Sequence, residues 1–168
     1  LIVNGVTSTE FRPDASITRA EFAAIVTRGL GIQDAAYAGS FKDVTSSNWY
    51  AGAVQAAINY KLIDGYEDGT FRPDQNISRQ EATAVLARAA SIAKLQSVLS
   101  AAEVTRVLSA FKDGSEVASW ALTNVAAAIS LNLMNGRGEV LEVDANLTRA
   151  ETAALVRRLL QAAQLINQ

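Results

Sequence analysis

A five-residue pattern recurs three times in this chain: a hydrophobic residue, Thr or Ser, Arg, a small or amide residue, and Glu. The copies are residues 17–21, 77–81 and 147–151. Each copy opens a run of apolar residues at helical spacing, so the chain is an internal repeat with three helices that begin in the same way. We expect these helices to begin within two residues of Thr18, Ser78 and Thr148.

Within each copy, the hydroxyl residue and the Glu three positions later have the spacing of a capping box. In that arrangement the hydroxyl and the carboxylate each satisfy a backbone N–H group that is left open at a helix start. These two positions therefore predict local structure.

The arginine of each copy, at Arg19, Arg79 and Arg149, falls on the first helical position. A cation there faces the positive end of the helix dipole, at a cost of about 0.3–1 kcal/mol. One interpretation is an anion site, in which the guanidinium and free helix N–H groups bind a carboxylate or phosphate. Loss of Arg79 would then weaken binding and change stability little. The other interpretation is an ion pair with a carboxylate of a neighbouring repeat.

Other elements recur in step with this motif. A Phe-Lys-Asp segment is followed by a tryptophan at residues 41–49 and again at 111–120. Each tryptophan opens an alanine-rich helix, at 49–60 and 120–131, and small residues allow such helices to approach closely near a shared axis. Gly5, Gly65 and Gly136 lie in Asn-Gly or Asp-Gly pairs, which supply positive φ angles in tight turns.

The motif spacing defines three repeats, at about 1–32, 41–92 and 111–166, within a single domain 1–168. The interval between successive motif arginines is 60 residues and then 70 residues. The difference predicts an inserted helix at about 93–110, with Ser100 as a candidate cap. The first repeat is expected to be incomplete, because Leu1 aligns with Lys61 and no Phe-Lys-Asp segment precedes it.

Composition excludes several function classes. A net charge of −2 and a pI near 5.2 argue against nucleic acid as a partner. The chain has no His and no Cys, so the commonest general base, nucleophile and transition-metal ligands are missing. We therefore expect no enzyme activity, no metal site and no cofactor. No apolar run is long enough for a membrane span, and no signal peptide is recognisable.

These motifs together resemble a tandem of three S-layer homology modules. The resemblance rests on the Phe-Lys-Asp…Trp segments, the Gly-x-x-Asp-Gly-Thr-Phe-x-Pro-Asp type of loop at residues 65–74, and the Thr-Arg-Ala-Glu helix starts. It implies an all-α fold in which three repeats pack as a pseudo-threefold helical prism with short ordered loops. It also implies a non-catalytic anchor that binds pyruvylated secondary cell-wall polymer on peptidoglycan. Such a chain would be extracellular, at the bacterial cell wall or S-layer, and part of a larger surface protein.

The resemblance also assigns roles to residues. It implies that Arg19, Arg79 and Arg149 hold the carboxylate of a pyruvate ketal. It gives Asp43 and Asp113 a hydrogen bond to sugar hydroxyls, although either could cap the following helix. It makes Trp49 and Trp120 an apolar wall for the sugar, although either could be ordinary core. Gly5, Gly65 and Gly136 would let the backbone approach the ligand, or would serve only the turn.

Three departures from the family pattern lead to further expectations. Gln80 stands where Ala is usual and is expected to face outward. The third copy has Leu141-Glu142-Val143-Asp144 in place of Phe-Arg-Pro-Asp and adds Glu139, which predicts a more negative surrounding for Arg149. Two Asp/Trp sets serve three arginines, so at most two complete pockets are expected.

A helical protein-interaction or S-layer self-assembly scaffold is the alternative function. The anchor requires Arg19 and Arg79 to direct spare donors into grooves. The scaffold requires each arginine to be matched by a protein carboxylate.

Overall fold

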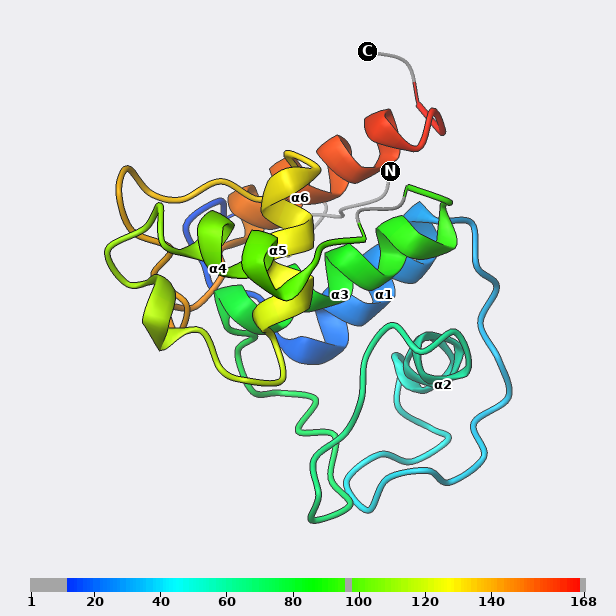
Figure 1. Cartoon of the computed structure of the whole chain (residues 1–168). Coiled ribbons are helices and arrows are strands. Elements are labelled where there is room, and N and C mark those ends of the chain that lie inside the picture. The colour runs from blue at the N-terminus through cyan, green and yellow to red at the C-terminus, as the bar shows by residue number, and fades with distance from the viewer. Residues whose placement is uncertain (1–11, 96–97, 167–168) are drawn as a thin grey trace.

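The computed structural model describes residues 12–95 and 98–166, and Gly5 lies outside them. Within these ranges the protein is all-α, with six α-helices, one short 3₁₀ helix at Gly114–Glu116 and no strands (Figure 1). No helix there is both long and apolar enough to cross a membrane. The helices are α1 (Arg19–Gly29), α2 (Ala51–Asn59), α3 (Arg79–Ile92), α4 (Ala101–Leu108), α5 (Leu122–Ser130) and α6 (Arg149–Ala162).

The predicted starts of α1, α3 and α6 are confirmed. Thr18, Ser78 and Thr148 are the N-cap residues, and each forms a complete capping box with the Glu three positions later. The predicted insertion is also a helix: α4 begins after Ser100, whose side chain forms a fourth capping box with Glu103. The local sequence thus determines where four of the six helices begin.

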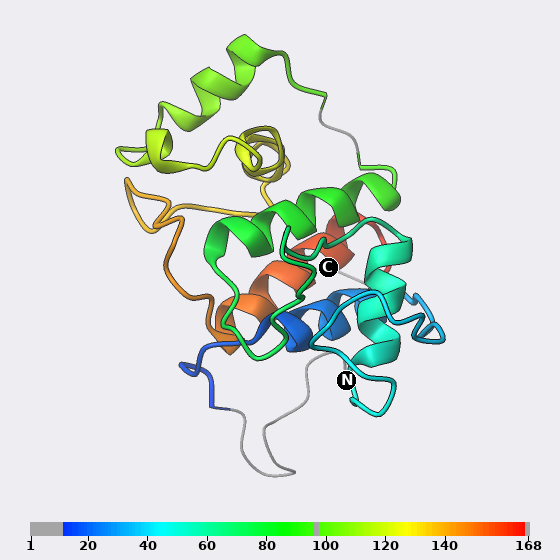
Figure 2. The same ribbon diagram turned by 90° about the horizontal axis from the view of Figure 1, so that it is seen from below.

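Helices α1, α3 and α6 contact one another at the centre of the molecule (Figure 2). The alanine-rich helices α2 and α5 lie outside this group, so the prediction that they lie near a shared axis is wrong. Helix α2 packs on α1, and α5 packs on both α3 and α4. Alanine allows close approach, but the larger side chains of the motif helices fill more volume. The central position therefore goes to the helices that bury the larger apolar groups.

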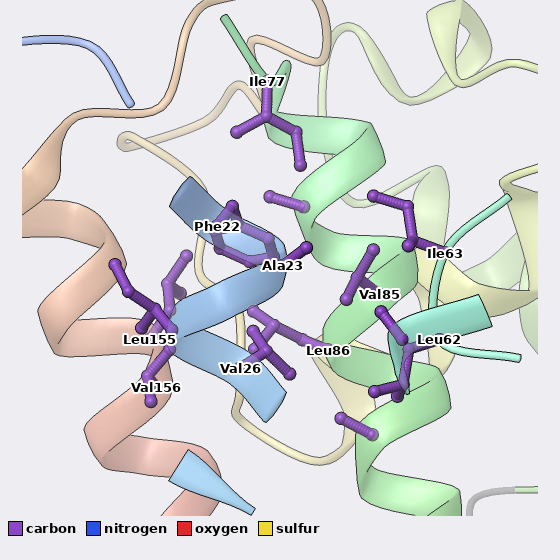
Figure 3. Close-up of a cluster of buried hydrophobic side chains, with 14 of the residues drawn as sticks. Phe22, Ala23, Val26, Leu62, Ile63, Ile77, Val85, Leu86, Leu155 and Val156 are labelled. Carbon is purple, nitrogen blue, oxygen red and sulfur yellow. The ribbon is translucent and has the colours of Figure 1, made fainter. Parts of the chain in front are cut away.

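The core between the central helices is formed by branched and aromatic side chains. Phe22 and Val26 of α1, Leu86 of α3 and Leu155 and Val156 of α6 point toward one another (Figure 3). A second, smaller cluster lies around α5 and includes Leu108, Val125 and Leu141. The inserted helix therefore adds its own apolar contacts at one side of the protein.

A closed ring of backbone hydrogen bonds joins the residues just before the three motif helices. The Ile17 N–H donates to the Leu147 carbonyl (3.0 Å), the Leu147 N–H to Ile77 (3.1 Å), and the Ile77 N–H back to Ile17 (3.0 Å). All three side chains have no exposed surface. The ring brings the starts of α1, α3 and α6 to one place and fixes the position of the motif arginines.

Candidate functional site

The three motif arginines are buried, and each forms an ion pair with the motif glutamate of another repeat. Their exposed fractions are between 3% and 6%. The pairs run in one direction around the protein, from the first repeat to the second, the second to the third, and the third to the first. The pairs and their Nη1–Oε1 distances are Arg19–Glu81 at 2.7 Å, Arg79–Glu151 at 2.8 Å and Arg149–Glu21 at 3.3 Å.

These guanidinium groups also donate hydrogen bonds to backbone carbonyls. Arg19 donates from Nε to the Phe71 carbonyl (2.9 Å) and from Nη2 to the Asp64 carbonyl (3.0 Å). Arg79 makes the corresponding bonds to Leu141 (2.8 Å) and Asn135 (3.2 Å). The structure therefore contains the bridge to a neighbouring repeat, the second of the two interpretations of this motif.

The motif glutamates both cap a helix and bind an arginine. Glu81 accepts the Ser78 backbone N–H on Oε2 (2.9 Å), and it accepts Arg19 (2.7 Å) and the Tyr66 hydroxyl (2.9 Å) on Oε1. Burial raises the pKa of Tyr66, and its bond to Glu81 acts in the same direction, so the phenol stays protonated and donates. The sequence indicated only the cap; the recurrence of Arg and Glu together was the available signal for the bridge.

Glu151 has the same two roles, with Arg137 in place of the tyrosine. It accepts from Arg79, from Arg137 Nη2 (2.7 Å) and from the Thr148 backbone N–H (3.0 Å). Burial raises the pKa of Glu151, but these hydrogen bonds and the charges of both arginines outweigh burial and lower the pKa below 4.5. The ionised form is thus favoured by folding.

We expect acid to destabilise the protein partly through Glu151. Because the folded pKa lies below the unfolded value, the stabilisation is complete above about pH 4.5 and is lost as the pH falls through the folded pKa. Glu151→Gln should make the free energy of unfolding, measured by urea denaturation, depend less steeply on pH below about 5. Glu139→Gln, which removes an exposed pairing with Lys112, is the matched control. Equal slopes for Glu151→Gln and the wild type would contradict this prediction.

Asp43 and Asp113 hold the loop that precedes a motif helix. The two carboxylate oxygens of Asp43 accept the backbone N–H groups of Phe71 (2.8 Å) and Arg72 (2.7 Å). Those of Asp113 accept Leu141 and Glu142, both at 2.7 Å. Neither carboxylate caps the helix that follows it, so the capping interpretation is wrong.

Gly65 and Gly136 leave space for an aromatic ring. A Cβ atom on Gly65 would lie 2.1 Å from the Phe41 ring, and one on Gly136 would lie 2.5 Å from Phe111. The positive φ angles expected of these glycines occur elsewhere in their loops, at Gly69 and Gly138. The Phe of each Phe-Lys-Asp segment therefore packs directly on the glycine of the turn.

A large groove, with a volume of about 670 Å³, opens beside Arg19. Its walls come from all three repeats: Arg19 from the first, the 63–72 loop and α3 from the second, and Trp120 from the third. The Arg72 guanidinium lies 3.8 Å from the centre of the Tyr66 ring. The residues that line this groove are Arg19, Ile63, Asp64, Gly65, Tyr66, Glu67, Asp68, Arg72, Glu81, Ala84, Val85, Arg88 and Trp120.

A small groove of about 170 Å³ lies at the equivalent place beside Arg79. Neither Trp49 nor Trp120 lines it. The residues that line it are Arg79, Met134, Asn135, Gly136, Arg137, Glu151, Ala154, Leu155 and Arg158.

The two tryptophans are surface residues, so the core interpretation is wrong for both. Trp120 is 54% exposed and forms part of the wall of the large groove. Trp49 is 60% exposed, lines neither described groove and contacts Tyr50 edge to face, with ring centres 5.4 Å apart.

Two expectations about the departures are also wrong. Gln80 is buried, because its amide donates to Asp144 (2.5 Å) and accepts the Ala118 N–H (3.0 Å). The third-copy loop packs on Arg79 and not on Arg149, since pairing crosses between repeats. Its acidic residues Glu142 and Glu139 form ion pairs with Arg137 and Lys112. The additional negative charge is therefore neutralised by these two cations.

Comparison with known proteins agrees with this repeat architecture. The sequence pattern of the S-layer homology domain matches residues 1–23, 40–83 and 110–153. The chain belongs to the S-layer homology domain family. The three matched segments each end within a motif helix, so the family pattern includes the Arg and Glu positions that form the ion pairs.

Relatives of this S-layer homology chain include an amylopullulanase from Thermoanaerobacterium thermosulfurigenes, 38% identical over 95% of this chain and 8% of the relative. Two others are from Acetivibrio thermocellus. Cell surface glycoprotein 1 is 33% identical over 95% of this chain and 7% of the relative. A cellulosome-anchoring protein is 32% identical over 90% of this chain and 33% of the relative. The chain thus spans a third or less of the length of these relatives, which include cell-surface proteins.

Within residues 12–95 and 98–166, no group of three or more carboxylates is placed to hold a metal ion. The candidate site of this S-layer homology domain consists of the two grooves and the buried arginine pairs beside them.

Proposed function

We propose that this chain is a non-catalytic module that anchors a larger surface protein to the bacterial cell wall. In this proposal it binds a pyruvylated secondary cell-wall polymer attached to peptidoglycan, in grooves between repeats. Relatives with very different names, among them an amylopullulanase and a cellulosome-anchoring protein, share this segment. A shared role that is separate from each protein's own activity explains that distribution.

The observation that carries this proposal is the large groove. It combines an exposed indole and a phenol, which are groups that stack on sugar rings, with polar side chains that can hydrogen-bond to sugar hydroxyls. Its walls come from three repeats, so it exists only when all three are assembled. This accounts for a binding module that occurs as a triple repeat.

The same reasoning favours a pseudo-threefold prism as the arrangement of the repeats. The backbone ring and the three Arg–Glu pairs each pass from one repeat to the next and return to the first. Equivalent contacts repeated around one point are what a threefold arrangement requires.

Within this proposal the candidate site residues have different tasks. Arg19, Arg79 and Arg149 mainly hold the groove walls through their glutamate partners. Asp43 and Asp113 fix the loops that line the grooves, and Gly65 and Gly136 allow those loops to pack. Contact with the sugar falls to Trp120 in the large groove. Trp49, which is exposed, and Gly5 are proposed as further ligand contacts.

The alternative function, a self-assembly or protein-interaction scaffold, is supported by one observation. Arg19, Arg79 and Arg149 are each matched by a protein carboxylate, as that function requires. We favour the anchor because the pairs account for the arginines but do not account for an exposed tryptophan at the edge of a large groove.

We expect the wild-type protein to bind purified polymer and to lose most of that binding when the polymer's pyruvate is removed. Trp120→Ala should weaken binding about tenfold, because stacking on an exposed indole is lost. Isothermal titration calorimetry with both polymers is the measurement. Tyr60→Ala, which removes another half-exposed aromatic side chain that lines neither described groove, is the matched control.

Thermal unfolding should be nearly unchanged in both variants. If the wild-type protein did not bind the polymer and instead formed defined oligomers, the anchoring function would be wrong and the scaffold function would be supported.

A further inference from the structure

The two grooves differ at positions that correspond in the repeat. The large groove has Asp64 and Tyr66, and the small groove has Asn135 and Arg137 at the equivalent places. Each groove also has an arginine nine residues after the start of its lining helix, Arg88 in α3 and Arg158 in α6. Compared with the large groove, the small groove therefore lacks one carboxylate and has one additional guanidinium group.

The consequence is clearest at these two helix arginines. Arg88 pairs with Asp64 at 2.8 Å and also donates to the Leu62 carbonyl at 3.3 Å. Arg158 is exposed and makes no ion pair or hydrogen bond with any residue in the described part of the chain. Asn135, at the position of Asp64, offers no charge to pair with it.

The charges of the two grooves follow. Three arginines and four carboxylates line the large groove, a net charge of −1. Three arginines and one carboxylate line the small groove, a net charge of +2, which becomes +1 when the Arg137 partner Glu142 is included. In the large groove each arginine has its own carboxylate partner.

We propose that the small groove is the site of the polymer's acidic group, with Arg158 as its principal contact, and that the large groove takes uncharged sugar rings. This inference rests on the proposed function. An arginine without a protein partner can give both its charge and its donors to a carboxylate, whereas Arg88 would first have to leave Asp64. The volume of about 170 Å³ suits a small acidic substituent, and the large groove offers Trp120 for stacking.

The first test compares Arg158→Gln with Arg88→Gln in titrations of purified pyruvylated polymer. Arg158→Gln should weaken binding about tenfold and reduce its dependence on salt, while Arg88→Gln should change it less than threefold. With polymer stripped of pyruvate, Arg158→Gln and the wild type should bind alike. Equal losses in both variants, or a loss at Arg88 alone, would overturn the inference.

A reciprocal pair of loop variants tests the same assignment without touching either arginine. Asn135→Asp gives Arg158 the kind of partner that Arg88 has, and should weaken binding of the pyruvylated polymer severalfold. Asp64→Asn frees Arg88 and should leave binding equal or stronger. Both side chains are exposed, so the fold should tolerate either change, which circular dichroism would check.

The outcomes separate the two levels of the proposal. A wild type that fails to bind pyruvylated polymer would overturn the anchoring function itself. A wild type that binds, with Asn135→Asp and Arg158→Gln unaffected, would leave anchoring intact and overturn the assignment of the acidic group to the small groove.

Discussion

Replacing Arg19 by alanine is expected to lower the free energy of unfolding by about 3–5 kcal/mol, because it breaks an ion pair that is almost completely buried. Glu81, whose side chain is 18% exposed, would keep its charge with only Tyr66 and a backbone N–H as donors. The carbonyls of Phe71 and Asp64 would also lose a donor. Urea denaturation followed by circular dichroism is the measurement.

Arg88→Ala is the matched control for Arg19→Ala. It removes an arginine of the same groove whose partner carboxylate is 72% exposed, and exposed pairs contribute only about 0–1 kcal/mol. Arg19→Lys should fall between the two, since an ammonium group keeps the charge but loses the planar set of donors. If Arg19→Ala unfolded at the normal urea concentration but no longer bound the polymer, Arg19 would be a ligand-binding residue and not a structural one.

Replacing Asp113 by alanine is expected to lower the free energy of unfolding by about 2–3 kcal/mol. The carboxylate accepts two backbone N–H groups, those of Leu141 and Glu142. Hydrogen bonds to a charged group contribute about 1.5–3 kcal/mol each, and the partial exposure of Asp113 reduces their sum. Glu142 has a φ angle of +51°, so this loop is held in a conformation that side chains rarely adopt. Asp43→Ala should cost less, because Asp43 is more exposed.

Thermal denaturation of Asp113→Ala, compared with Lys112→Ala, tests this prediction. Lys112 is the neighbouring residue, and its pairing with Glu139 is exposed, so its loss should shift stability by less than about 1 kcal/mol. Similar losses in the two variants would mean that the Asp113 contacts do not hold the loop. Polymer binding in Asp113→Ala should fall only as far as the small groove is distorted.

Most of the fold could be predicted because its signals are local. A hydroxyl residue and a glutamate three positions apart specify a helix start, and four such pairs mark α1, α3, α4 and α6 correctly. The inserted helix follows from the difference between the two repeat intervals. Which helices lie at the centre of the fold does not follow from repeat length. It depends on which helix faces bury more apolar surface when the repeats pack together.

The partners of the motif arginines could not be read from local sequence. Arg19 and Glu81 are 62 residues apart, and Arg149 and Glu21 are 128 apart. The expectation that Arg79 could be removed at little cost to stability assumed an exposed guanidinium. Its burial and its hydrogen bonds to protein groups remove that assumption. The prediction that Gln80 faces outward failed for a similar reason. Its hydrogen-bond partners Asp144 and Ala118 belong to another repeat and cannot be recognised from local sequence.

The closed ring through Ile17, Ile77 and Leu147 affects how such a protein would respond to mechanical load. In a linear array the last repeat touches one neighbour, so tension can peel repeats away in succession. In a ring every repeat is held on two sides, and no end is available from which peeling can start. A pulling force must therefore break contacts on both sides of a repeat at once, and the anchor yields in a single large step.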